Sequence, residues 1–185
     1  MALGSLLNTN ASTTVESPRS QINCTEVMHA YSRMSDNERA GELTRLIEAV
    51  KRRKDERTNF FDDFKVGQTL GQGSFGTVYL SVDKETQVPC ATKIIDRQAI
   101  KDNVKSEKLT LLLKNELRVM LHLQNLTRTG QAHDNLTKVI AIYKDPFQYY
   151  LVMELVPGGN LLDFYNDYQE MSVKKCEAMV KNIVG

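Results

Sequence analysis

The spacing of hydrophobic residues changes along the chain, and the first regular pattern has the period of a helix. Ser35 and Glu38 form a capping box that would start a helix at Asp36. The cations of the run 51–54 fall in its last turns, where the helix dipole favours them. We therefore expect an amphipathic helix from about Asp36 to Arg57, inside an N-terminal segment of residues 31–60. Its apolar stripe is Ala40, Leu43, Leu46, Ile47 and Val50.

From Phe64 the apolar residues alternate with a period of two, which is typical of half-buried strands. One helical stretch interrupts this pattern, and its stripe is Leu109, Leu112, Leu113, Leu117 and Met120. The pattern predicts an α+β fold, in which a five-stranded antiparallel sheet is combined with one long helix. The expected strands are Lys65–Leu70, Thr77–Val82, Val88–Ile95, Leu136–Tyr143 and Tyr149–Glu154.

The two ends of the chain differ from this central part. Residues 1–30 are rich in Ser, Thr and Asn and have few large apolar side chains, so we expect a disordered tail. Residues 157–159, Pro-Gly-Gly, break the strand pattern, and helical spacing returns from Leu161 to Gly185. The sequence thus divides into a tail (1–30), a helical segment (31–60), a sheet-and-helix unit (61–156) and the start of a helical region (157–185).

Charge and composition narrow the classes of function. The 185 residues hold 24 Lys and Arg against 23 Asp and Glu, so the net charge of +1 gives no field that would gather nucleic acid or an anionic membrane. No apolar window approaches the ~18 residues of a membrane span. Cys24, Cys90 and Cys176 form neither a metal-ligand spacing nor an even disulfide set. We expect a cytoplasmic protein with no nucleic-acid or membrane partner and no metal site of its own.

The first candidate for chemistry is the glycine loop at 71–76. Gly71, Gly73 and Gly76 form a G-x-G-x-x-G pattern, which dinucleotide-binding folds also use, but there a helix follows the glycines. Here an alternating strand follows, so the loop belongs to a hairpin. Glycines let backbone amides approach phosphate oxygens, and the apolar Leu70 and Val78 beside them suit the covering of a base. An ordinary glycine-rich hairpin is the alternative.

A cation and a carboxylate form the second candidate. Ala91 and Lys93 lie two residues apart on a predicted strand, so both project from the same face. Glu116 falls on the apolar stripe of the long helix. A buried carboxylate needs a cation, and Lys93 is the one available on an adjacent strand. The alternatives are a solvated surface lysine and a glutamate at the edge of the stripe.

Together these segments resemble the N-terminal lobe of eukaryotic protein kinases, of the serine/threonine type and closest to the calcium/calmodulin-dependent and calcium-dependent group. The resemblance covers about residues 62–185 and implies that the chain binds ATP with Mg²⁺ and, in a complete kinase, phosphorylates a protein substrate. It is carried by LGQGSFGTVYL at 70–80, CATK at 90–93, the helical Glu116, HDNL at 133–136 and YLVMELVPGGNLLDFY at 150–165.

The resemblance also implies roles for individual residues. Lys93 would hold the α- and β-phosphates of ATP and pair with Glu116 as the catalytic pair, Glu107 being the alternative partner. The backbone of Glu154 and Val156 would read the adenine edge, with Met153 as gatekeeper. The remaining cofactor-binding residues would be Leu70, Gly71, Gln72, Gly73, Ser74, Phe75, Gly76, Val78 and Ala91.

The sequence departs from the family pattern at several places. Thr92 replaces the usual apolar residue before the lysine, residues 125–132 look like an insertion, and Asn160 stands where an acid often recognises a basic substrate residue. The catalytic loop and the metal-binding Asp-Phe-Gly would lie beyond Gly185. We therefore expect this chain alone to be inactive. The alternative is a non-catalytic, truncated kinase module that acts by binding nucleotide or protein, and helix 36–57 would dock on the lobe or on a protein partner.

Overall fold

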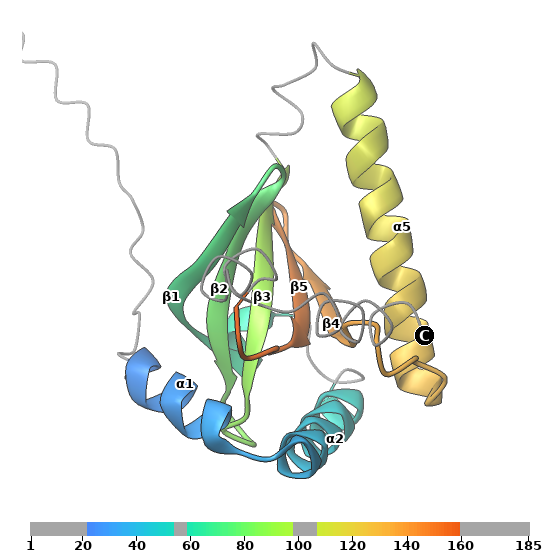
Figure 1. Cartoon of the computed structure of the whole chain (residues 1–185). Helices are drawn as coiled ribbons and strands as arrows, with labels where there is room; N and C mark the ends of the chain where they lie inside the picture. The colour runs from blue at the N-terminus through green and yellow to red at the C-terminus, as the bar shows by residue number, and fades with distance from the viewer. Residues whose placement is uncertain (1–21, 54–58, 98–106, 160–185) are drawn as a thin grey trace, which may run out of the picture.

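The computed structural model describes residues 22–53, 59–97 and 107–159, with the side chains of the longest helix described from residue 111 on. Figure 1 shows a twisted sheet with two helices at one end and a long helix along one side. The helices are α1 (Cys24–Arg33), α2 (Asp36–Arg53), α3 (Phe60–Asp63) and α5 (Glu107–Thr129). The strands are β1 (Phe64–Gly73), β2 (Gly76–Asp83), β3 (Pro89–Asp96), β4 (Val139–Lys144) and β5 (Gln148–Glu154).

The five strands form one antiparallel sheet in the order β1-β2-β3-β5-β4. This confirms the α+β fold expected from the alternating pattern. The fourth strand begins at Val139 rather than at Leu136, because the Leu136 amide donates to the carbonyl of His133 in a preceding turn. Residues 160–185, which include Asn160 and the expected helical region, lie outside the described residues.

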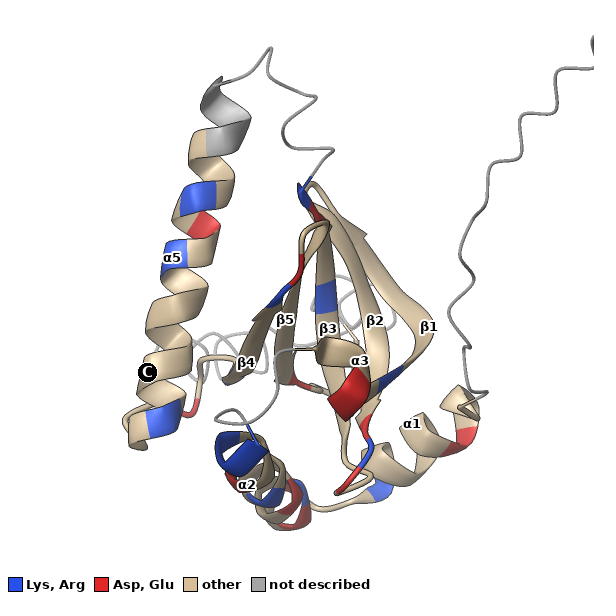
Figure 2. Ribbon diagram, turned by 180° about the vertical axis from the view of Figure 1, so that it is seen from behind, with Lys and Arg blue, Asp and Glu red and all other residues tan. Residues whose placement is uncertain are grey.

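The two faces of the sheet carry different partners. One face packs against α2 and α3, and Figure 2 shows α3 in front of it. The core on this face contains Leu46, Val50, Phe60, Phe64 and Val152. The opposite face holds the residues for which the sequence predicts chemistry, and it contacts α1 and α5. Consecutive side chains along β3 and β5 lie on opposite faces of the sheet, so each of these strands contributes side chains to the core on both faces.

Residues 24–33 form a helix, so the expectation of a disordered tail up to residue 30 is wrong for its last part. Asn23 caps α1 by accepting a hydrogen bond from the Glu26 amide at 3.3 Å. Val27, Met28 and Tyr31 pack against the sheet. The burial of these side chains offsets the loss of conformational entropy when the helix forms, although this part of the sequence has few apolar residues. Residues 1–21 lie outside the described part of the chain.

Helix α2 docks on the sheet, as one of the two alternatives predicted. Its capping box is present: the Ser35 amide donates to Glu38 Oε2 at 2.7 Å, and the Glu38 amide donates to Ser35 Oγ at 3.3 Å. Leu46 and Val50 are 1% and 2% exposed in the core against α3. The helix runs to Arg53, and residues 54–58, where its end was expected, are not described.

Arg53 fixes the end of α2 to the sheet through buried charges. Its Nη2 donates to Asp83 Oδ2 at 2.5 Å, and its Nη1 lies 3.6 Å from Asp63 Oδ1. Asp63 also accepts a hydrogen bond from the Tyr143 hydroxyl at 2.8 Å. Burial alone would lower the pKa of Arg53, but its hydrogen bond and attraction to Asp83 outweigh burial and raise that pKa. The guanidinium therefore stays charged and joins α2, α3 and β2.

Helix α5 lies beside β4 and β5 (Figure 1) and buries part of its predicted stripe. Leu113 is 5% exposed, and Leu117 and Met120 pack around it. The prediction is wrong for Leu112, which is 45% exposed because the buried line follows the spacing 113, 117, 120. The helix continues to Thr129, so most of the expected insertion at 125–132 lengthens it, and Gly130, with a φ of +73°, follows its end. Within the described ranges, no helix is both long and apolar enough to cross a membrane.

The edge strand β1 is irregular where α1 meets it. Its register with β2 shifts between Val66 and Thr69 and again between Thr69 and Gly71. In this stretch the Gln68 amide donates to Cys24 Sγ at 3.2 Å. A Cβ on Gly67 would come within 2.5 Å of the same sulfur, so a side chain there would force the Cys24 side chain to move. The start of α1 thus closes over the bulged part of the edge.

Candidate functional site

The glycine loop joins β1 to β2, which confirms the predicted hairpin and excludes the strand-to-helix geometry of a dinucleotide fold. A Cβ on Gly76 would lie 2.1 Å from the carbonyl oxygen of Ile94, so only glycine lets the start of β2 pass this close to β3. A Cβ on Gly73 would lie 4.0 Å from Lys93 Nζ. The backbone of the loop at Gly73 therefore lies next to the ammonium group of Lys93.

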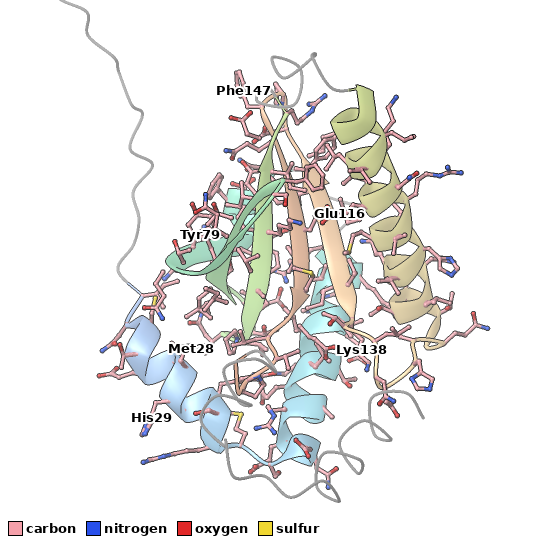
Figure 3. The ribbon with its side chains drawn as sticks, turned by 45° about the horizontal axis from the view of Figure 1, so that its top comes forward. Met28, His29, Tyr79, Glu116, Lys138 and Phe147 are labelled. Atoms are coloured by element: carbon pink, nitrogen blue, oxygen red, sulfur yellow. The ribbon has the colours of Figure 1, made fainter. Side chains whose placement is uncertain are left out.

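Lys93 and Glu116 form an ion pair between Nζ and Oε1, joining β3 to α5. Figure 3 shows Glu116 on the side of α5 that faces the sheet. The side chains are 16% and 20% exposed, so the pair is mostly shielded from water. This confirms the predicted pairing and argues against a solvated surface lysine. The side chain of Glu107, the alternative partner, is not described.

The residues expected to cover a ring share one face of the sheet with Lys93. Val78 pairs with Lys93 across β2 and β3, and Ala91 pairs with Met153 across β3 and β5. Leu70, at the start of the loop, is 38% exposed. Together they make an apolar surface next to a cation, which suits an aromatic ring that carries a charged group.

The other loop residues divide between solvent and core. The side chains of Gln72 and Ser74 are exposed to solvent, so we expect these two residues to contribute to the site through their backbone. Phe75 is partly buried and packs against the cluster of Ile95, Leu113 and Leu151 on the α5 side. The loop tip is therefore attached to the same apolar cluster that holds α5 against the sheet.

The segment that leaves β5, residues 154–157, is here called the hinge. The Glu154 amide donates to the Lys138 carbonyl at 3.0 Å, and the Glu154 carboxylate accepts from the Lys138 amide at 2.7 Å. A backbone contribution of Glu154 to a ligand therefore falls to its carbonyl oxygen. Val156 is 62% exposed and has an amide to donate, whereas Pro157 has none.

The sequence reasoning missed three residues around this site. Leu80 is completely buried and pairs with Ala91 across β2 and β3, and Leu155, between Glu154 and Val156, is 5% exposed. Leu80 alternates with Val78 and was open to prediction from the period of two. Tyr31 of α1, which packs on both leucines, carries no signal in the sequence that places it there.

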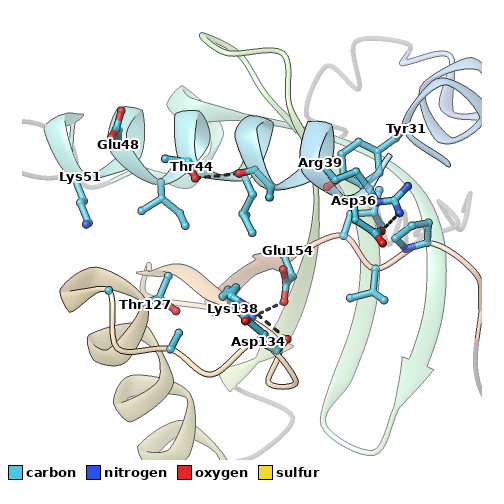
Figure 4. Close-up of a pocket in the computed structure, with 18 residues that line it drawn as sticks. Tyr31, Asp36, Arg39, Thr44, Glu48, Lys51, Thr127, Asp134, Lys138 and Glu154 are labelled. Atoms are coloured by element: carbon cyan, nitrogen blue, oxygen red, sulfur yellow. Dashed lines mark hydrogen bonds and ion pairs between the residues drawn. The ribbon is translucent and has the colours of Figure 1, made fainter. Parts of the chain in front are cut away.

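A concave region lies between α2 and the hinge, with a cavity of about 840 Å³ (Figure 4). It contains none of the glycine-loop residues and not Lys93. Its cations already have partners: Lys51 Nζ donates to the Arg128 carbonyl at 2.8 Å, and Lys138 Nζ lies 3.7 Å from Asp134. We therefore assign it no ligand. Among the described residues no group of three or more His, Cys, Asp or Glu side chains is placed to hold a metal ion.

Comparison with known proteins gives consistent matches. Residues 64–185 match the protein kinase domain. The chain is 31% identical over 129 residues to calcium-dependent protein kinase 4 of Solanum tuberosum, and 33% identical over 129 residues to calcium-dependent protein kinase 6 of Arabidopsis thaliana. Each alignment covers 69% of this chain and 21% of the relative. Aurora kinase C of Mus musculus is 28% identical over 122 residues, covering 66% of this chain and 40% of the relative. The chain thus spans about a fifth of the length of the calcium-dependent kinases it matches.

Proposed function

The chain belongs to the protein kinase family, and from this premise we propose that its sheet and α5 form the ATP-binding lobe of a serine/threonine protein kinase. The observation that carries the proposal is the shielded Lys93–Glu116 pair beneath the glycine loop. An ion pair with only a structural role does not require a glycine-rich loop beside its lysine. A phosphate-binding site requires one, because backbone amides and an ammonium group must approach the phosphate oxygens together.

The residues present fit ATP. The phosphates would lie between the loop backbone of 71–76 and Lys93, in space that a Cβ on Gly73 would enter. The adenine ring would lie against Leu70, Val78 and Ala91, with Met153 behind it. The hinge would read the ring edge through the Glu154 carbonyl and the Val156 amide.

Glu116 would orient Lys93 rather than touch the substrate. Its carboxylate holds the ammonium near the loop, so the cation is in place before the nucleotide arrives and less reorganisation is needed on binding. Mg²⁺, the family's usual companion of ATP, supplies neutralisation of phosphate charge when it is bound. We assign no described residue to it.

The test is nucleotide binding by the purified chain, followed with a fluorescent trinitrophenyl derivative of ATP. We expect weak binding, with a Kd well above about 1 μM, because in the protein kinase family the floor of the nucleotide pocket and the metal site come from a second lobe. Lys93→Met should weaken it about tenfold or more. Lys114→Met removes an exposed cation from the same helix as Glu116 and should leave binding unchanged. Equal binding by wild type and Lys93→Met would contradict the proposal.

A double-mutant cycle tests the partnership itself. Lys93→Met and Glu116→Gln should be strongly non-additive in nucleotide affinity, because either change removes the same oriented ammonium. Simple additivity would show that Glu116 does not act through Lys93.

Phosphoryl transfer separates the proposal from its alternative. For the 185 residues alone we expect no transfer of label from ATP to a generic protein mixture, since neither His-Arg-Asp nor Asp-Phe-Gly occurs in the sequence between Lys93 and Gly185. Transfer that Lys93→Met abolishes in the purified chain would contradict this expectation. A chain extended by a catalytic loop and an Asp-Phe-Gly should phosphorylate Ser or Thr. If it binds nucleotide without transfer, a non-catalytic module that acts by binding nucleotide or protein is the better description.

A further inference from the structure

Helix α1 packs against the same face of the sheet as the proposed nucleotide site. Tyr31, Leu80 and Leu155 form the buried centre of this contact, with exposures of 4%, 0% and 5%. Cys24, Val27, Met28, Met34 and Ala91 pack around them. Burial in this cluster also raises the pKa of the Tyr31 hydroxyl above its usual value.

The helix joins the far edge of the sheet to the hinge. At one end Cys24 Sγ accepts the hydrogen bond from the Gln68 amide of β1. At the other end Tyr31 reaches Leu155, between the two hinge residues proposed to read the adenine edge. Figure 1 shows α1 running under the lower ends of β1, β2 and β3. One helix therefore shares an apolar cluster with Ala91, in the roof of the proposed ring site, and with Leu155, in its side wall.

We propose that α1 is a positioning element of the nucleotide site, which holds the Ala91 strand and the hinge at the separation that the adenine ring requires. This inference rests on the proposed function. Leu80 and Leu155 would gain water contact if α1 moved away, and relaxation of these two side chains would move the roof and wall between which the ring fits. Docking of α1 and binding of the nucleotide would then be thermodynamically coupled.

A matched pair of substitutions on neighbouring α1 residues tests the coupling. Met28 packs toward the sheet, whereas His29 points away from it (Figure 3). Met28→Asp places a carboxylate in the apolar contact, and His29→Asp adds the same charge on the exposed side of the helix. In the full chain, Met28→Asp should weaken binding of the trinitrophenyl derivative of ATP about fivefold or more. His29→Asp should match the wild type.

Two further readouts separate positioning from loss of fold. The backbone amide NMR signals of Ala91 and Leu155 should shift in Met28→Asp, while that of Lys144, on the opposite edge strand, should not. Met28→Leu should restore both the affinity and the signals. If Met28→Asp does not fold, the milder Val27→Ala with Met28→Ala, which preserves helix propensity, should give a smaller change in the same direction, with His29→Ala as its control.

The outcomes distinguish this inference from the function on which it rests. Wild-type affinity in Met28→Asp would overturn the role of α1 and leave the nucleotide site standing. Tighter binding would also overturn it, because α1 would then obstruct the ring. Absence of any Lys93-dependent binding in the wild type would overturn the proposed function, and this inference with it.

Discussion

The charge cluster at the end of α2 gives a prediction that the structure makes quantitative. Arg53→Met would remove the guanidinium that lies 2.5 Å from Asp83 Oδ2 and 3.6 Å from Asp63 Oδ1. Methionine keeps much of the side-chain volume, so the change isolates charge rather than packing. We expect it to be among the most destabilising single substitutions on α2.

The expected magnitude follows from what is left behind. The carboxylate of Asp83 is 0% exposed, so water cannot replace the cation that it would lose. Removing one member of a buried ion pair typically costs about 3–5 kcal/mol. Asp83 keeps hydrogen bonds from the amide and hydroxyl of Thr86, and Asp63 keeps that from Tyr143, so the lower part of the range applies. We therefore expect a loss of about 3 kcal/mol out of a total stability of roughly 5–15 kcal/mol.

Urea unfolding of the full chain measures this loss, and the neighbouring residue supplies the control. Arg52 pairs with Glu85 on the surface, where the two side chains are 69% and 45% exposed. Arg52→Met should therefore cost no more than about 0.5 kcal/mol. Adding Asp83→Asn to Arg53→Met should recover part of the loss, because it removes the stranded charge. Equal losses for Arg52→Met and Arg53→Met, within about 0.5 kcal/mol, would refute the assignment of Arg53 as a buried anchor.

Three further predictions concern the sheet and α2. Gly76→Ala should destabilise the chain by about 2–3 kcal/mol in urea unfolding, because its Cβ would meet the Ile94 carbonyl at 2.1 Å. Gly71→Ala has nothing within 4 Å of its Cβ and should be nearly neutral, and equal effects would contradict the close approach of β2 and β3. The buried Thr92 hydroxyl lies beside the thiol of Cys90, a weak hydrogen-bond partner, and has no stronger partner within the described structure. The Thr92→Val substitution should therefore raise the unfolding midpoint, by about 1 kcal/mol in stability; a lower midpoint would show that the hydroxyl is satisfied. Amides of 43–50 should exchange slowly in the full chain and fast in a peptide of residues 30–60, whereas fast exchange in both would exclude docking of α2.

The sheet and the ion pair were open to prediction because local patterns determine them. Alternation places Ala91 and Lys93 on one face, and the apolar stripe of α5 turns Glu116 toward that face. The glycine loop was assigned to a hairpin from the strand that follows it. In each case a short stretch of sequence carries the relevant period, and the burial of one face selects the register.

The position of α1 depends on tertiary contacts that cannot be predicted from a local sequence pattern. Val27, Met28 and Tyr31 are few apolar residues for a helix, and their stabilisation comes from packing against Leu80 and Leu155, which lie at least 49 residues away in the sequence. The exposure of Leu112 has the same origin, since the sheet contacts a narrower strip of α5 than the apolar residues alone suggest. Long-range packing overrides composition at both places.

The bulged strand β1 also bears on how copies of this chain meet one another. It is an edge of the sheet, and an unpaired edge offers its amides and carbonyls to strands of neighbouring molecules. The two register shifts twist β1, so that it lacks the regular geometry that such pairing needs. The Gln68 amide already donates a hydrogen bond to Cys24 Sγ. We therefore expect loss of α1 to expose a template for intermolecular strand addition, so that aggregation would begin at β1.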